Sequence, residues 1–101
     1  MRILIIEDET PAADRLKKMI LDVEPKAEIT SNLVSISSAV KWLNENPTPD
    51  LIFMDIHLSD GDSFQIFKDI EVKSPVVFVT AYDQYALDAF KVNSIDYLLK
   101  P

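Results

Sequence analysis

The sequence contains no cysteine, one glycine and one histidine. The absence of cysteine excludes a disulfide scaffold, a thiolate metal site and a cysteine nucleophile. A single glycine excludes the glycine-rich phosphate loops of the GxGxxG and Walker A types. The single histidine disfavours histidine-rich zinc sites and His-dependent catalytic triads. No apolar run approaches the roughly 18 residues of a membrane span, and no signal peptide is recognisable, so we expect a cytoplasmic protein with no membrane partner.

The remaining composition is that of one globular domain. The chain has 101 residues, of which 48% are apolar and 27% are charged. Acidic residues outnumber basic residues by 17 to 10, which gives a net charge of −7. Such a surface repels phosphate backbones, so this stretch by itself is not expected to bind nucleic acid.

Apolar patterns of strand period and of helix period take turns along the chain. Continuous apolar runs of strand length alternate with segments of helical spacing, the first of which opens with Thr10 as a cap and Pro11 behind it. This alternation predicts parallel strands with helices on both faces of the sheet. The expected strands are 3–6, 27–31, 51–54, 76–79 and 96–99, and the expected helices are 11–23, behind the Thr10 cap, then 36–43, 64–70 and 85–92.

Polar side chains follow the strong strands. In an open parallel sheet, ligands bind in the crevice at the carboxyl ends of the strands, so these side chains should meet at one edge. An acid after a strand also commonly opens the next helix, which is the simpler interpretation of Glu9 taken alone. The residues are Glu7, Asp8 and Glu9 after the first strand, then Asp55, Thr80 and Lys100 after later ones.

This set of groups supports phosphoryl chemistry. Asp55 directly follows an apolar run, where a carboxylate is costly unless it is paired or metal-bound. Converging carboxylates repel one another and favour a hard cation, and an oxygen-only ligand set suits Mg²⁺. A carboxylate can attack phosphorus to give an acyl phosphate, while Lys100 and the metal neutralise the phosphoryl oxygens and Thr80 donates a hydrogen bond to one. The residues therefore predict an aspartyl-phosphate site with Mg²⁺.

The motifs ILIIEDE, LIFMDIHLSDG, VVFVTAY and DYLLKP follow one another in that order. Over nearly its whole length the chain resembles the receiver domains of bacterial two-component response regulators. The stretch AYDQYALDAFKVNSIDYLLKP is most similar to receivers joined to a LytTR-type DNA-binding domain. The resemblance implies a flavodoxin-like three-layer α/β sandwich with five parallel strands in the order 2-1-3-4-5.

In such receivers a fifth helix follows the Lys-Pro pair, whereas this chain ends at Pro101. We therefore expect residues 1–101 to form a receiver domain that lacks this helix and has no effector domain. One side of the last strand, including Leu98, should then be open.

The resemblance also implies roles for single residues at the metal site. Asp8 and Asp55 are expected to ligate Mg²⁺, with the backbone carbonyl of His57 as a third protein ligand. Glu7 is expected to reach the metal through water. The imidazole of His57 is not expected to be a ligand, because Mg²⁺ prefers oxygen.

The remaining implied roles concern the phosphoryl group. Asp55 is the expected phosphoacceptor, Lys100 contacts the phosphoryl group, and Thr80 and Tyr97 form a switch pair. A sensor histidine kinase is the expected donor. Phosphorylation is expected to change the surface of the fourth helix and fifth strand and to favour a homodimer. It would thereby control an effector, a transcription regulator that contacts DNA through a C-terminal domain. The chain is not expected to be a turnover enzyme.

Two departures and two alternatives remain. Ser59 stands where the family usually has proline, and the glycine falls earlier, at Gly61, so the shape of this loop should differ.

A phosphatase of haloacid-dehalogenase type also uses aspartate, threonine, lysine and Mg²⁺, but it needs a second aspartate where this chain has His57. The other alternative is a pseudo-receiver, an interaction module that is never phosphorylated.

Overall fold

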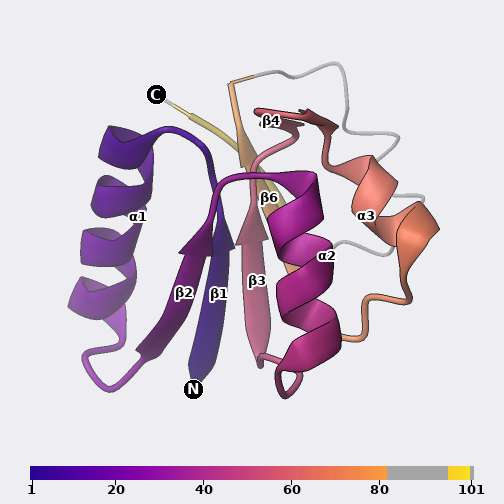
Figure 1. The fold of residues 1–101 in the computed structure, drawn as a ribbon. Coiled ribbons are helices and arrows are strands. Elements are labelled where there is room, and N and C mark those ends of the chain that lie inside the picture. Colours follow the sequence, from indigo (N-terminus) through magenta and orange to yellow (C-terminus); the bar gives the residue numbers. More distant parts are fainter. Residues whose placement is uncertain (82–95, 101) are drawn as a thin grey trace.

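The computed structural model describes residues 1–81 and 96–100. Alternating strands and helices follow one another along this part of the chain (Figure 1). In chain order they are β1 (Arg2–Ile6), α1 (Thr10–Val23), β2 (Glu28–Leu33), α2 (Ile36–Glu45), β3 (Leu51–Met54), β4 (His57–Leu58), β5 (Gly61–Asp62), α3 (Phe64–Asp69), β6 (Val76–Thr80) and β7 (Asp96–Leu99).

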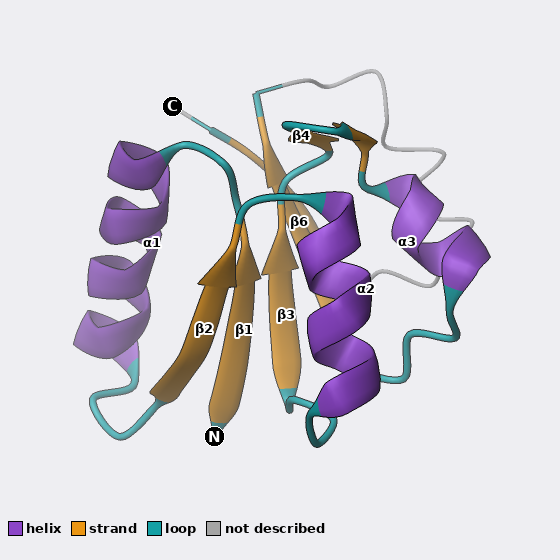
Figure 2. Ribbon diagram, viewed as in Figure 1, coloured by secondary structure: helices purple, strands orange, loops and turns teal. Residues whose placement is uncertain are grey.

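Five of the strands form one parallel sheet in the order β2-β1-β3-β6-β7. Counting only these strands, the order is the predicted 2-1-3-4-5. Helix α1 lies on one side of the sheet, and helices α2 and α3 lie on the other (Figure 2). The predicted three-layer α/β architecture is therefore confirmed. No helix in the described part of the chain is long and apolar enough to cross a membrane.

The core is divided by the sheet into two apolar clusters. Successive residues of β1 point to opposite faces, so Ile3 and Ile5 pack with α1 while Leu4 and Ile6 pack on the α2 and α3 side. Trp42 of α2 packs, partly buried, against the larger cluster. The strands are thus held by burial on both faces, which fixes where their carboxyl ends lie.

The structure differs from the predicted elements in details. The edge strand β2 runs from 28 to 33 rather than from 27 to 31. The N-cap of α1 is Glu9, and Thr10, the predicted cap, is the first helical residue. The cap is displaced because the chain leaves the extended conformation one residue earlier than the Thr-Pro pair suggests. The expected helix at 85–92 lies outside the described residues.

A short antiparallel hairpin, β4–β5, follows Asp55 where only a loop was expected. Gly61 adopts a φ of 140°, which residues other than glycine rarely adopt. The altered loop predicted from Ser59 and Gly61 is therefore a hairpin. Its two strands are only two residues long, which is too short for any hydrophobic period to reveal.

Candidate functional site

Two acids lie buried at the carboxyl ends of neighbouring central strands. Main-chain hydrogen bonds continue the sheet beyond the strands, because the N–H of Glu7 donates to the carbonyl of Leu33 at 2.8 Å and the N–H of Asp55 to that of Ile6 at 2.9 Å. Glu7 is 4% exposed and Asp55 is 5% exposed. The sheet therefore holds two carboxylates side by side in a nearly dry position.

Lys100 delivers one ammonium to both of these acids. Its main-chain N–H donates to the carbonyl of Thr80 at 2.7 Å, which fixes the residue just beyond β7. The Nζ atom lies 2.5 Å from Oε1 of Glu7 and 2.9 Å from Oδ2 of Asp55. It also lies 3.7 Å from Oε1 of Glu9, whose side chain is mostly exposed. The predicted convergence of Asp55 and Lys100 is present, and Glu7 is part of it.

Burial and hydrogen bonding change the protonation equilibria of Glu7 and Lys100. Desolvation is the main cause that raises the pKa of Glu7 to about 7, and the neighbouring charge of Asp55 adds to it, while the hydrogen bond from Lys100 opposes both. Burial alone would lower the pKa of Lys100, but its hydrogen bonds to Glu7 and Asp55 outweigh this and raise the pKa above its usual value. The lysine therefore stays charged and is a single cation between two buried acids.

Four carboxylates gather at this edge. Each of Glu7, Asp8, Glu9 and Asp55 offers an oxygen atom, and these atoms lie within 4.8 Å of one another. Oxygen atoms are the ligands that Mg²⁺ prefers, and a second positive charge is favourable beside two buried acids that share one ammonium. The donor set therefore fits a hard divalent cation. Glu9 serves both as the N-cap of α1 and as a member of this cluster, so its interpretation as a helix-opening acid was incomplete.

Two other predicted site residues flank the acids. Thr80 is fully buried at the end of β6. His57 lies in β4 opposite Asp62, with its side chain exposed. The imidazole of His57 is not part of the group of side chains that gathers around Asp55. The ligand role of the His57 carbonyl and the phosphoryl contact of Thr80 stay predictions.

Tyr97 lies on β7 with its ring toward the larger apolar cluster. It pairs in register with Phe78, and the two ring centroids are 6.4 Å apart. The ring is half-buried on the face that α2 and α3 cover. The structure thus places Tyr97 beside β6, the strand that ends at Thr80, and its switch role stays a prediction.

Two acids of the hairpin have structural roles that the sequence patterns did not reveal. Asp60 accepts hydrogen bonds from the main chain at the start of α2, and Asp62 accepts one from Phe64 at the start of α3. An aspartate two residues before a helix is a recognised turn signal, which could have revealed Asp62. Asp60 acts 24 residues away in the sequence, and no local pattern reports such a contact.

Comparison with known proteins gives consistent matches over the whole chain. A family model described as the response regulator receiver domain matches residues 3–101. The sensory transduction protein LytT of Bacillus anthracis is 41% identical over 104 residues, which cover 100% of this chain and 42% of that protein. LytT of Bacillus subtilis (strain 168) is likewise 41% identical and covered to 42%. The chain therefore spans less than half the length of these curated relatives.

Solved structures show the same fold. The response regulatory domain of protein mrkE from Klebsiella pneumoniae has a TM-score of 0.84 at 31% identity, with 100% of this chain and 84% of that one covered. The response regulator TrrA from Thermotoga maritima, solved in complex with Mg²⁺ and BeF, has a TM-score of 0.80 at 23% identity, with 99% and 86% covered. The LytT relatives confirm the likeness predicted from the C-terminal stretch. The chain belongs to the response regulator receiver domain family, the signalling domains of two-component systems.

Proposed function

We propose that Asp55 accepts a phosphoryl group from the phosphohistidine of a sensor histidine kinase, in a Mg²⁺-dependent reaction in the cytoplasm. The observation that carries this proposal is the way the Asp55 carboxylate is held. Its Oδ1 accepts the N–H of Ile56 at 2.7 Å, and its Oδ2 lies 2.9 Å from the ammonium of Lys100. A buried carboxylate with both oxygens oriented, beside other acids and a lysine, is a prepared nucleophile.

The transfer needs no general base, because a carboxylate is ionised at neutral pH. A carboxylate oxygen of Asp55 forms the new bond to phosphorus as the phosphorus–nitrogen bond of the donor breaks. The departing imidazole nitrogen keeps the electron pair of that bond and takes up a proton from water, so that neutral imidazole leaves. Lys100 stays within reach of the phosphoryl oxygens and offsets the charge that gathers there.

The residues that would hold the metal are Asp8, Asp55 and the main-chain carbonyl of His57, with Glu7 through a water molecule. When bound, Mg²⁺ supplies positive charge to the phosphoryl oxygens. The acidic cluster supports this assignment, and so does the Mg²⁺ in the structure of TrrA, which belongs to that protein.

The change that phosphorylation causes in the rest of the domain begins at the groups next to the phosphoryl site. The Thr80 hydroxyl moves toward a phosphoryl oxygen and frees space into which the Tyr97 ring turns. Phosphorylation can bias this equilibrium only as far as it favours one state over the other. The altered surface then favours a homodimer and controls an effector that acts on transcription, with DNA contacted through a C-terminal domain. The LytT relatives are named sensory transduction proteins, which supports a role in signal transduction.

The assignment is tested by intact mass after incubation with Mg²⁺ and a small acyl phosphate. The wild-type chain should gain one phosphate, and Asp55→Asn should gain none. Asp62→Asn is the matched control, because it removes an acid of the same loop that lies outside the cluster. An equal gain in Asp55→Asn would place the phosphate elsewhere. No gain in the wild type, with a kinase donor or a small donor, would favour the pseudo-receiver alternative. The family match leaves no support for the haloacid-dehalogenase alternative.

A further inference from the structure

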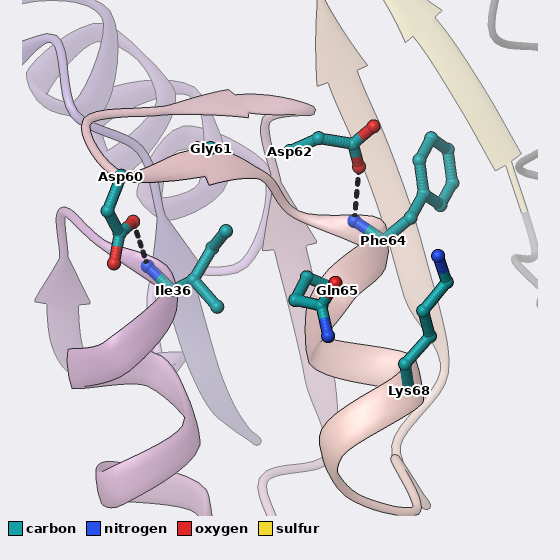
Figure 3. Close-up of a pocket in the computed structure, with 7 residues that line it drawn as sticks. All are labelled: Ile36, Asp60, Gly61, Asp62, Phe64, Gln65 and Lys68. Atoms are coloured by element: carbon teal, nitrogen blue, oxygen red, sulfur yellow. Dashed lines mark hydrogen bonds between the residues drawn. The ribbon is translucent and has the colours of Figure 1, made fainter.

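The hairpin that follows Asp55 is bonded to the start of helix α2. Asp60, in the turn of the hairpin, accepts the N–H of Ile36 with Oδ1 at 2.7 Å and the N–H of Ser37 with Oδ2 at 3.1 Å. Figure 3 shows the Asp60 carboxylate directed at the first turn of α2. Hydrogen bonds to these two main-chain donors and the positive end of the helix dipole both hold the carboxylate ionised, which is why its pKa is lowered.

Helix α2 does not need Asp60 in order to begin. Its own N-cap, Ser35, accepts the N–H of Ser38 at 3.1 Å, and the Ser38 hydroxyl accepts the N–H of Ser35 at 3.3 Å, which completes a capping box. A helix start leaves its first N–H groups without intrahelical partners. The local cap satisfies one of them, and Asp60 satisfies the two at Ile36 and Ser37. The bonds of Asp60 therefore connect two segments rather than initiate a helix.

A second bond and a close packing contact join the same segments. The hydroxyl of Ser59 donates to the carbonyl of Val34 at 3.2 Å, a bond that the usual proline of the family has no donor to make. A Cβ atom on Gly61 would lie only 3.3 Å from Cδ1 of Ile36. Three consecutive residues of the hairpin thus contact the segment 34–37, which runs from the end of β2 into the first turn of α2.

The contacts of Ser59, Asp60 and Gly61 with residues 34–37 act on the segment that follows Asp55. His57 and Leu58 form the strand that pairs with Gly61 and Asp62, so the hairpin turn fixes the course of the main chain just after Asp55. The segment 34–37 follows Leu33, the last residue of β2, whose carbonyl also accepts the N–H of Glu7. Through these bonds the loop after Asp55 and the acidic end of β1 are held against the same segment.

We propose that Asp60 is a positioning residue for the phosphoacceptor site, because it holds the loop after Asp55, including the carbonyl of His57, in the place where it binds the metal. This inference rests on the proposed function. It predicts that removing the hydrogen bonds of Asp60 weakens the binding of Mg²⁺ while leaving Asp55 and Lys100 in place. Phosphorylation should then slow at low Mg²⁺ and recover when Mg²⁺ saturates.

The test compares Asp60→Ala, Asp60→Asn and Asp62→Asn in the full chain. Asp62→Asn removes one charge from the same hairpin but keeps an amide oxygen for the N–H of Phe64, so it measures the effect of charge alone. Asp60→Ala should raise the Kd for Mg²⁺, measured by calorimetry, about tenfold, within the range known for residues that support metal ligands. Asp60→Asn should have a smaller effect, because it keeps one acceptor, and Asp62→Asn should bind Mg²⁺ nearly as the wild type does.

A second measurement needs no metal. Hydrogen exchange at residues 56–62 should be faster in Asp60→Ala than in the wild type or Asp62→Asn. Equal Mg²⁺ affinity in Asp60→Ala and wild type, or an equal loss in Asp62→Asn, would overturn the positioning role. If the wild type binds Mg²⁺ but takes up no phosphate, the proposed function fails and the affinities still decide. If the wild type binds no Mg²⁺, unchanged exchange at 56–62 would overturn the positioning role.

Discussion

The ammonium of Lys100 lies 2.5 Å from Oε1 of Glu7, closer than its 2.9 Å to Oδ2 of Asp55. The sequence pattern predicted that this lysine lies near Asp55 and the phosphoryl group, and the resemblance to receiver domains implied that Glu7 lies at the metal. In the structure one cation serves both acids. The lysine therefore neutralises the buried carboxylates when no other cation is present, which gives it a structural role besides the proposed phosphoryl contact.

Replacing Lys100 should make the stability of the folded protein depend on bound metal. Lys100→Met leaves Glu7 and Asp55 buried without a countercharge, which should lower the free energy of unfolding by about 1–3 kcal/mol in the absence of Mg²⁺. Thermal melts with and without Mg²⁺ should show a larger stabilisation by the metal in this variant than in the wild type. The exposed Lys41→Met is the control and should respond as the wild type does. An equal response to Mg²⁺ in both variants would contradict the shared role of Lys100.

The proposed switch makes a prediction about where the domain changes. Beryllofluoride, a mimic of the phosphoryl group, should alter hydrogen exchange most over residues 84–99, of which 96–99 form β7. Thr80→Ala should abolish this difference, because the hydroxyl that follows the phosphoryl oxygen is gone. Changes concentrated at residues 36–46 instead would show that the signal leaves by another route.

The lowered pKa of Asp60 predicts a stability that depends on pH. A group whose pKa is lower in the folded chain stabilises it above the pKa of the unfolded chain, near 4, and this contribution is lost as pH falls through the folded pKa. Asp60→Asn should therefore differ from the wild type in its urea midpoint at pH 6, and the difference should shrink toward pH 2. Asp22→Asn, which removes an exposed acid on α1, serves as the control. A constant difference across this range would rule out the ionised carboxylate as the source.

Much of the fold follows from the apolar runs, because strands buried on both faces have to be continuously apolar. The order of the strands came from the resemblance to the family, and the sheet confirms it. The edge strand β2 was the least certain, because it contains polar residues such as Asn32 and packs only in part. The hairpin β4–β5 was not predicted, since its pairing depends on the turn around Gly61 and on contacts with α2.

The candidate site was predictable for a similar reason. Parallel strands bring their carboxyl ends to one edge, so Asp55 and the acids after β1 had to meet. Which acid a long side chain contacts depends on the direction that the side chain takes from the end of its strand. The spacing of residues in the sequence does not predict that direction. The bond from Lys100 to Glu7 and the bond from the Ile36 N–H to Asp60 are both of this kind. They join residues far apart in sequence through side chains, and only the folded structure shows them.

The last prediction concerns an apolar groove beside the site. A groove of about 370 Å³ lies between α1 and the ends of β6 and β7, and Met19 and Leu98 are among its lining residues. Within residues 1–101, Met19 is 63% exposed and Leu98 is 44% exposed. A helix laid on such a face buries about 300–400 Å² of apolar surface, which is worth about 8–10 kcal/mol.

Whole domains of this size are stable by only about 5–15 kcal/mol, so leaving this face in water is a large deficit. A polypeptide limited to residues 1–101 should therefore unfold at a low temperature or associate through the groove. Sedimentation and thermal melts over a range of protein concentrations measure both. Leu98→Ser should reduce the association, whereas Val23→Ser, at an exposed position outside the groove, should leave it unchanged. A monomer at micromolar concentration with a sharp melt that does not depend on concentration would show that covering this face contributes far less than the area implies.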